Sequence, residues 1–150
     1  MSILVIDPRP IHRRTMSHIL ADLGYEPPRG CGSLREAERL LEYMAARSKP
    51  EKVDLIFVGW ELPTDQIRML VEYARTSPIA QAAPVVGVSD QAFASDIIAA
   101  LALGIDAFMI RPLIPVIVSK KLETLLGVRN TEPASVFDAY RKNFDLGTVV

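Results

Sequence analysis

The sequence predicts an α/β protein built on a doubly wound, five-stranded parallel sheet of the flavodoxin-like type. The chain has 150 residues, of which 49% are hydrophobic and 23% charged, which suits one globular domain with a single core region. Five short apolar runs alternate along it with five segments whose apolar residues recur at helical spacing. Strands that alternate with helices pair in parallel and carry helices on both faces of the sheet.

The first strand is predicted at Ile3–Ile6, a continuous apolar run typical of a parallel strand buried on both faces. A helix is expected near 10–23. Pro10 suits its first turn, where a missing N–H costs nothing, and Gly24 is a natural residue just past its end.

The second strand–helix unit has a weak strand and a well-marked helix. Residues 25–32 contain two adjacent prolines, which favour an edge strand or a loop. Ser33 and Glu36 have the spacing of a capping box, in which the hydroxyl serves the third helical amide and the carboxylate reaches back. We therefore predict a helix near 34–47.

The last three units follow the same order. Glycines close the final two helices, and a proline opens the fourth strand. Strands are predicted at 53–58, 84–88 and 107–110, and helices are predicted after Thr64 or Asp65, near 92–103 and near 115–126.

Gly127 divides the chain into a domain of residues 1–127 and a tail of residues 128–150. An amphipathic helix is expected at about 133–145, because aromatic residues recur there on one side. Three docking modes stay open for this tail: on its own domain, on a second subunit, or on a partner protein. The aromatic residues are Phe137, Tyr140 and Phe144.

Composition excludes several classes of function. A net charge of −1 argues against broad binding to DNA or to an anionic membrane, and one cysteine excludes a disulfide framework and a cysteine-rich zinc site. His12 and His18 are six residues apart, off the spacing of a helical metal pair. The first residues do not resemble a signal peptide, and the longest charge-free apolar run is too short for a membrane helix. We therefore expect a cytoplasmic protein.

Ligand chemistry in such sheets gathers at the carboxyl ends of the strands. The residues at these ends carry a family resemblance: from Ile3 to about Leu126 the chain resembles the receiver domain of bacterial response regulators, the CheY-like family. The motifs that carry it are Leu4-Val5-Ile6-Asp7, Val58-Gly59-Trp60-Glu61-Leu62-Pro63, Pro84-Val85-Val86-Gly87-Val88-Ser89, Gly104-Ile105-Asp106-Ala107-Phe108 and Arg111-Pro112-Leu113.

The resemblance implies a phosphorylation site whose groups are largely replaced here. In the family, an aspartate after the third strand accepts a phosphoryl group. Two acidic residues after the first strand bind Mg²⁺ together with that aspartate. A Ser or Thr after the fourth strand and a lysine after the fifth strand bind the phosphoryl oxygens. Asp7 retains one acid and Pro8 replaces the other. Gly59 stands at the position of the nucleophile, Ser89 is retained, and Arg111 replaces the lysine.

Glycine has no nucleophile, so we expect no phosphoryl transfer, no enzymatic activity, and loss of Mg²⁺ binding, with no other cofactor or metal. Two states of Arg111 remain open: an ion pair with Asp7 that replaces the metal and phosphate, or a solvated side chain. Glu61 could turn inward as a substitute carboxylate ligand for Mg²⁺, and we give this alternative a low rank. Phe108 holds the family's aromatic switch position, and Pro112 follows a bond that is usually cis in the family.

Neither histidine is expected to serve Ser89 as a base, since neither lies at a strand end. We expect His12 on the apolar side of its helix, in the core or half-buried, and His18 exposed. Ser89 is better explained as a capping residue.

The leading hypothesis is a phosphorylation-independent pseudo-receiver that acts by protein–protein contact, as an adaptor or regulator in bacterial signalling. The partner would be a signalling protein, either a histidine kinase or an output protein, or else a second copy of the chain. The expected contact surface is the face formed by the fourth helix, fifth strand and fifth helix, together with the tail aromatics. On the helices and strand it comprises Ala102, Leu103, Ile114 and Val118.

The alternative is a ligand-binding effector. An arginine cluster near the first helix could bind an anionic nucleotide such as cyclic di-GMP, as some receiver-like proteins do. With Arg111, its members are Arg9, Arg13, Arg14 and Arg29.

Overall fold

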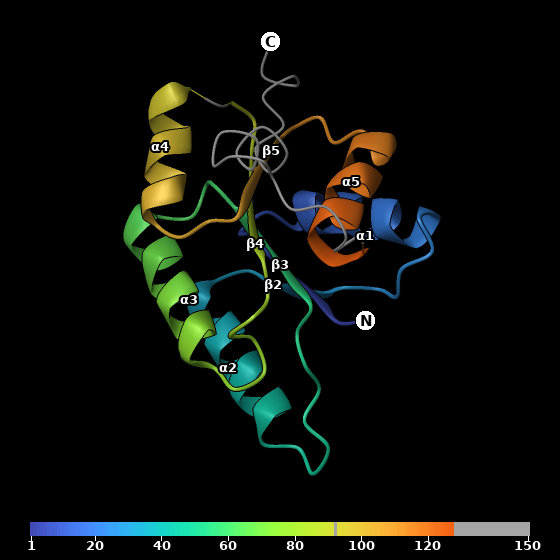
Figure 1. The fold of residues 1–150 in the computed structure, drawn as a ribbon, viewed down its shortest axis with the longest axis vertical. Coiled ribbons are helices and arrows are strands. Elements are labelled where there is room, and N and C mark those ends of the chain that lie inside the picture. The colour runs from blue at the N-terminus through green and yellow to red at the C-terminus, as the bar shows by residue number, and fades with distance from the viewer. Residues whose placement is uncertain (92, 128–150) are drawn as a thin grey trace.

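The computed structural model describes residues 1–91 and 93–127, and these form a three-layered α/β domain (Figure 1). Its five strands pair in parallel in the order β2-β1-β3-β4-β5, which confirms the predicted fold class. The strands are β1 (Ile3–Ile6), β2 (Arg29–Cys31), β3 (Leu55–Gly59), β4 (Val85–Ser89) and β5 (Ala107–Ile110).

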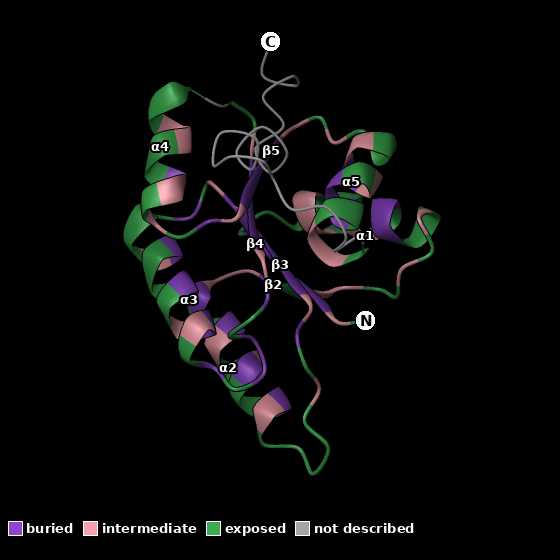
Figure 2. Ribbon diagram, viewed as in Figure 1, coloured by how far each residue is buried: buried purple, intermediate pink, exposed green. Residues whose placement is uncertain are grey.

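Helices α1 and α5 cover one face of the sheet and helices α2, α3 and α4 cover the other, as Figure 1 shows on either side of the strands. The helices are α1 (Pro10–Asp22), α2 (Leu34–Ala45), α3 (Thr64–Thr76), α4 (Ala94–Ala102) and α5 (Pro115–Leu122). Strands β1, β3, β4 and β5 are buried almost throughout, in agreement with their apolar sequences, whereas the edge strand β2 is buried only at Cys31 (Figure 2).

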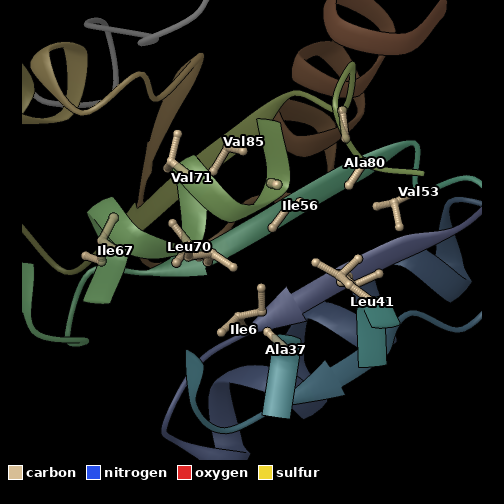
Figure 3. Close-up of a cluster of buried hydrophobic side chains, with 14 of the residues drawn as sticks. Ile6, Ala37, Leu41, Val53, Ile56, Ile67, Leu70, Val71, Ala80 and Val85 are labelled. Carbon is tan, nitrogen blue, oxygen red and sulfur yellow. The ribbon is translucent and has the colours of Figure 1, made fainter. Parts of the chain in front are cut away.

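The side of the sheet under α2, α3 and α4 holds the larger apolar cluster (Figure 3). Leu41 of α2 and Leu70 of α3 are almost completely buried there against Ile56 of β3. This packing fixes the positions of the strand ends that carry the candidate site.

Two predicted elements differ in detail. The last helix is α-helical only to Leu122 and continues as a π-helical turn over Glu123–Gly127. Of residues 25–32, only Arg29–Cys31 pair, as an edge strand beside β1, and the prolines precede the paired part.

The predicted cap of α2 is present in a modified form. The Ser33 hydroxyl accepts a hydrogen bond from the Glu36 N–H (3.2 Å), as expected. The Glu36 carboxylate, however, accepts from the Gly32 N–H (2.7 Å), one residue before the helix cap. None of the helices in the described part of the chain is both long and apolar enough to span a membrane.

Candidate functional site

The carboxyl ends of the strands bring the predicted site positions to one edge of the sheet. Asp7 directly follows β1, Gly59 ends β3, Ser89 ends β4, and Arg111 directly follows β5. The Arg111 N–H donates to the Ser89 carbonyl (2.7 Å), which ties the last two positions together, and the Arg111–Pro112 peptide is cis, as the resemblance implied.

Asp7 is a buried carboxylate with a full set of partners, its side chain only 4% exposed. One oxygen, Oδ1, accepts from the backbone N–H of Arg9 (2.9 Å). The other, Oδ2, accepts from the Arg111 guanidinium (2.8 Å). The His12 Nδ1 lies 3.1 Å from Oδ2 and 3.3 Å from Oδ1. A buried charge needs such partners to offset its lost hydration.

The Arg111 guanidinium lies among three carboxylates. Besides Asp7, its Nη1 contacts Glu61 (2.7 Å) and Asp90 (3.3 Å), and the Arg111 side chain is 13% exposed. Of the two states that the sequence left open for Arg111, the ion pair with Asp7 is therefore the one present. The alternative of a solvated Arg111 is wrong, because the planar guanidinium has enough donors to serve several acceptors at once.

Gly59 lies directly beneath Asp7. A Cβ atom built on Gly59 would lie 2.5 Å from Asp7 Oδ2 and 2.7 Å from its Cγ. The space in which a side chain at position 59 would begin is thus filled by the Asp7 carboxylate.

Ser89 is half-buried, and its hydroxyl accepts a hydrogen bond from the Gln91 N–H (3.3 Å). This bond stabilises the turn between β4 and α4. The serine was expected to cap a helix, and it caps a turn that precedes the helix start at Ala94.

Phe108, at the position of the family's aromatic switch, points into the core and is 1% exposed. Its ring makes an edge-to-face contact with Trp60, with centroids 5.1 Å apart and planes at 79°. Gly87 provides the room, since a Cβ there would lie 2.9 Å from the Phe108 ring and 3.1 Å from the Trp60 ring.

The sequence did not reveal the contacts of His12 and Asp90 at the site, and it suggested Glu61 only as a substitute metal ligand, not as a partner of Arg111. Neither histidine lies at a strand end. Helix α1 begins only three residues after Asp7, however, so its first turn lies over the strand ends and places His12 beside Asp7. Asp90 directly follows β4 and Glu61 lies two residues after the end of β3, and this closeness to the strand ends was the available signal. His18 is exposed, as expected.

The predicted arginine cluster is divided by the structure. Arg29 begins β2 at the amino end of the sheet, where it pairs with Glu51 (3.2 Å), remote from the strand ends that hold Arg111. The Arg13 guanidinium donates to the Asp7 carbonyl (2.6 Å). Arg9 and Arg14 are exposed. The five arginines therefore do not form one anion site.

The predicted contact surface is partly wrong. Val118 is completely buried against the sheet and cannot meet a partner, and Leu103 is half-buried beside α4. Ala102 and Ile114 are exposed, as expected. The three tail aromatics, Phe137, Tyr140 and Phe144, lie outside the described residues, as do residues 128–150 as a whole.

Magnesium, which the family implies, does not fit the residues at this edge. Mg²⁺ requires near-octahedral oxygen coordination and usually binds carboxylates. Pro8 and Gly59 supply no side-chain oxygen, and the group beside the remaining acid Asp7 is the His12 ring nitrogen, a ligand type that Mg²⁺ does not favour.

Comparison with known proteins supports the assignment of the fold. No family model matches the chain. It is 27% identical to a chemotaxis protein CheY homolog of Campylobacter jejuni over 135 residues, which are 90% of this chain and 99% of the relative. It is 25% identical to chemotaxis protein CheY1 of Helicobacter pylori, covering 87% of this chain and all of the relative.

Among solved structures, the signal receiver domain of a signal transduction histidine kinase from Syntrophus aciditrophicus superposes with a TM-score of 0.66 at 26% identity. The match covers 90% of this chain and 97% of that domain. With the observed strand order, these similarities show that the chain has a CheY-like α/β fold and is similar to chemotaxis and signal-receiver proteins of bacteria.

Proposed function

We propose that this receiver domain acts without phosphorylation, as a pseudo-receiver that works through protein–protein contact as an adaptor or regulator. The observation that carries the proposal is the Asp7–Arg111 ion pair above Gly59. The pair puts a fixed positive charge next to the remaining acid, where the family's chemistry needs a metal ion and a phosphoryl group.

The chemistry of the site supports this proposal. Covalent phosphoryl transfer needs a nucleophilic side chain, and position 59 has none. The retained Ser89 hydroxyl is engaged with a backbone N–H in a turn. We therefore infer that the protein is not an enzyme and that it does not use Mg²⁺.

The aromatic pair of Phe108 and Trp60 would connect the state of the site to the surface that binds the partner. Phe108 is held inward by Trp60 over Gly87, and Arg111 lies three residues further along the chain. With the Asp7–Arg111 pair in place of a phosphoryl group, the site would hold this one arrangement, so partner binding would not require phosphorylation of the site.

The face formed by α4, β5 and α5 is the surface we propose for the partner. Four large apolar side chains around it are exposed by about half or more: Phe93 (63%), Ile98 (67%), Ile114 (48%) and Val116 (58%). Such exposure at one side of a small domain is typical of a contact surface. We propose a histidine kinase or an output protein in the cytoplasm as the partner, with a second copy of this chain as the alternative occupant.

The test is treatment of the full chain with a small phosphodonor and Mg²⁺, followed by intact-mass measurement. We expect no phosphoryl adduct, whereas a receiver domain that retains its aspartate, treated in parallel, should gain one. An adduct on this chain would refute phosphorylation independence. An affinity capture from native cells, performed with and without the phosphodonor, should recover the same partner in the same amount.

A further inference from the structure

Three metal-binding atoms of different side chains converge at the mouth of the site. A ring nitrogen of His12, a carboxylate oxygen of Asp7 and a carboxylate oxygen of Glu61 all lie within 4.8 Å of one another. They come from the first turn of α1, the end of β1 and the loop after β3. We propose that these three side chains bind a zinc-class divalent cation, which competes with the Arg111 guanidinium for Asp7 and Glu61.

The spacing within this group suits zinc. Zn²⁺ binds histidine nitrogen and carboxylate oxygen at about 2.0–2.2 Å, so two ligand atoms of a tetrahedral site are about 3.4 Å apart. The His12 Nδ1 lies 3.1 Å from Asp7 Oδ2, which is already close to that separation. Metal binding then requires that Arg111 withdraw and that Glu61, whose side chain is 28% exposed, adjust its position.

The donor set favours zinc over magnesium. Imidazole nitrogen suits Zn²⁺ and neighbouring transition metals, whereas Mg²⁺ prefers six oxygen ligands in a rigid octahedron. The substitutions that remove the family's magnesium ligands therefore leave two oxygens and one nitrogen, a set suited to a borderline-soft cation with an open fourth position for water.

Arg111 shows that the two carboxylates already converge on one cation. Its Nη2 contacts Asp7 (2.8 Å) and its Nη1 contacts Glu61 (2.7 Å). Asp90, whose side chain is 60% exposed, is a third partner at 3.3 Å and would retain the guanidinium when a metal displaces it. Nδ1 must be free of a proton when it coordinates the metal, so a proton shared with Asp7 leaves to solvent on binding.

A small cavity lies at the floor of the site and leaves room for the proposed ligands to shift slightly. A cavity of about 10 Å³ is lined by Asp7, His12, Gly59 and Arg111, with apolar residues of the sheet and of α1 beneath. This is close to the space that one water molecule needs. This volume lies beside Asp7 and His12, two of the three proposed ligands.

The chain offers a matched pair of histidines for the test. Zinc affinity is measured on the untagged full chain by competition with a chromogenic chelator, with Trp60 fluorescence as a second readout, because Trp60 adjoins Glu61. We expect one zinc ion per chain, a loss of affinity of at least about tenfold in His12→Gln, and unchanged affinity in His18→Gln, which alters the exposed histidine of the same helix.

A second variant tests the competition. Arg111→Lys replaces the forked guanidinium by a single ammonium group, so zinc should bind more tightly than to the unaltered chain. The proposal is overturned if zinc does not bind at millimolar concentration, if His12→Gln binds as well as the unaltered chain, or if Mg²⁺ displaces zinc at equal concentration. Weaker zinc binding by Arg111→Lys would also contradict the competition.

Discussion

The Asp7 carboxylate fills the space above Gly59, so that a Cβ atom on Gly59 would lie 2.5 Å from Asp7 Oδ2. Asp7 cannot yield easily, because Arg111, the Arg9 N–H and His12 hold its two oxygens. The position of Asp7 therefore depends on glycine at position 59. With any side chain at that position, Asp7 could not occupy its observed place.

Gly59→Ala should destabilise the protein by about 1–3 kcal/mol, because the added methyl group forces Asp7 away from its partners. Urea denaturation measures this change in the free energy of unfolding. In an Asp7→Ala background the same substitution should cost clearly less, because the nearest contact atoms are then gone. An equal cost in both backgrounds would show that Asp7 and Gly59 are not coupled.

Gly87→Ala tests the inward position of Phe108. The added methyl group would lie 2.9 Å from the Phe108 ring and 3.1 Å from the Trp60 ring, so the aromatic pair has to separate. We expect a changed Trp60 emission spectrum and a loss of stability of about 1–3 kcal/mol. An unchanged spectrum, together with unchanged stability, would contradict the packing described here.

Cys31 should be unreactive in the folded protein. Burial, and secondly the Glu36 carboxylate, raise the pKa of its thiol from 9.0 to about 11, while Arg13 opposes the shift. The thiolate that reacts with disulfide reagents is therefore scarce at pH 8. Labelling by a thiol reagent at that pH should be far slower in the native protein than in urea, and equal rates would show that Cys31 is accessible.

The same pKa shift affects stability at high pH. Between about pH 9 and 11 the unfolded chain releases the Cys31 proton while the folded chain retains it, so the free energy of unfolding falls as pH rises. Cys31→Ala should show a shallower decline over this window, since its other titrating groups are unchanged. Parallel curves for the two proteins would exclude a contribution from Cys31.

Ile98→Asp and Ile114→Asp test the proposed contact surface. Both side chains are exposed, so the variants should keep their stability within about 0.5 kcal/mol. Each should reduce capture of the partner about tenfold or more, because a charge replaces an apolar contact. Met69→Asp, at a residue of α3 exposed to 49%, is the control and should capture the partner normally. Equal capture by all three variants would place the contact elsewhere.

The fold was predictable because its signals are local and repeated. The apolar run of β1 and the Ser33 cap of α2 each identify an element from a few neighbouring residues. The end of α5 was less predictable, since the change to a π-helical turn at Glu123 leaves no mark in the apolar periodicity.

The site was predictable only in part. The Asp7–Arg111 pair followed from substitutions at positions that the fold brings together. The separation of Arg29 from the other arginines could not be predicted in this way. Sequence position alone does not show that Arg29 begins strand β2, whereas Arg9 follows the end of strand β1. His12 was assigned by its helix stripe, and the periodicity gives no information on how far the first turn of α1 overhangs the neighbouring strand end.

The most direct test of the central claim is a double-mutant cycle on the buried pair, using Asp7→Asn, Arg111→Ala and the double variant in urea denaturation. We predict a coupling free energy of about 1.5–3 kcal/mol, since the two side chains are only 4% and 13% exposed. The Arg29–Glu51 pair, 38% exposed on both sides, should give no more than about 1 kcal/mol in the same experiment. A coupling of Asp7 to Arg111 that is indistinguishable from zero would contradict the account.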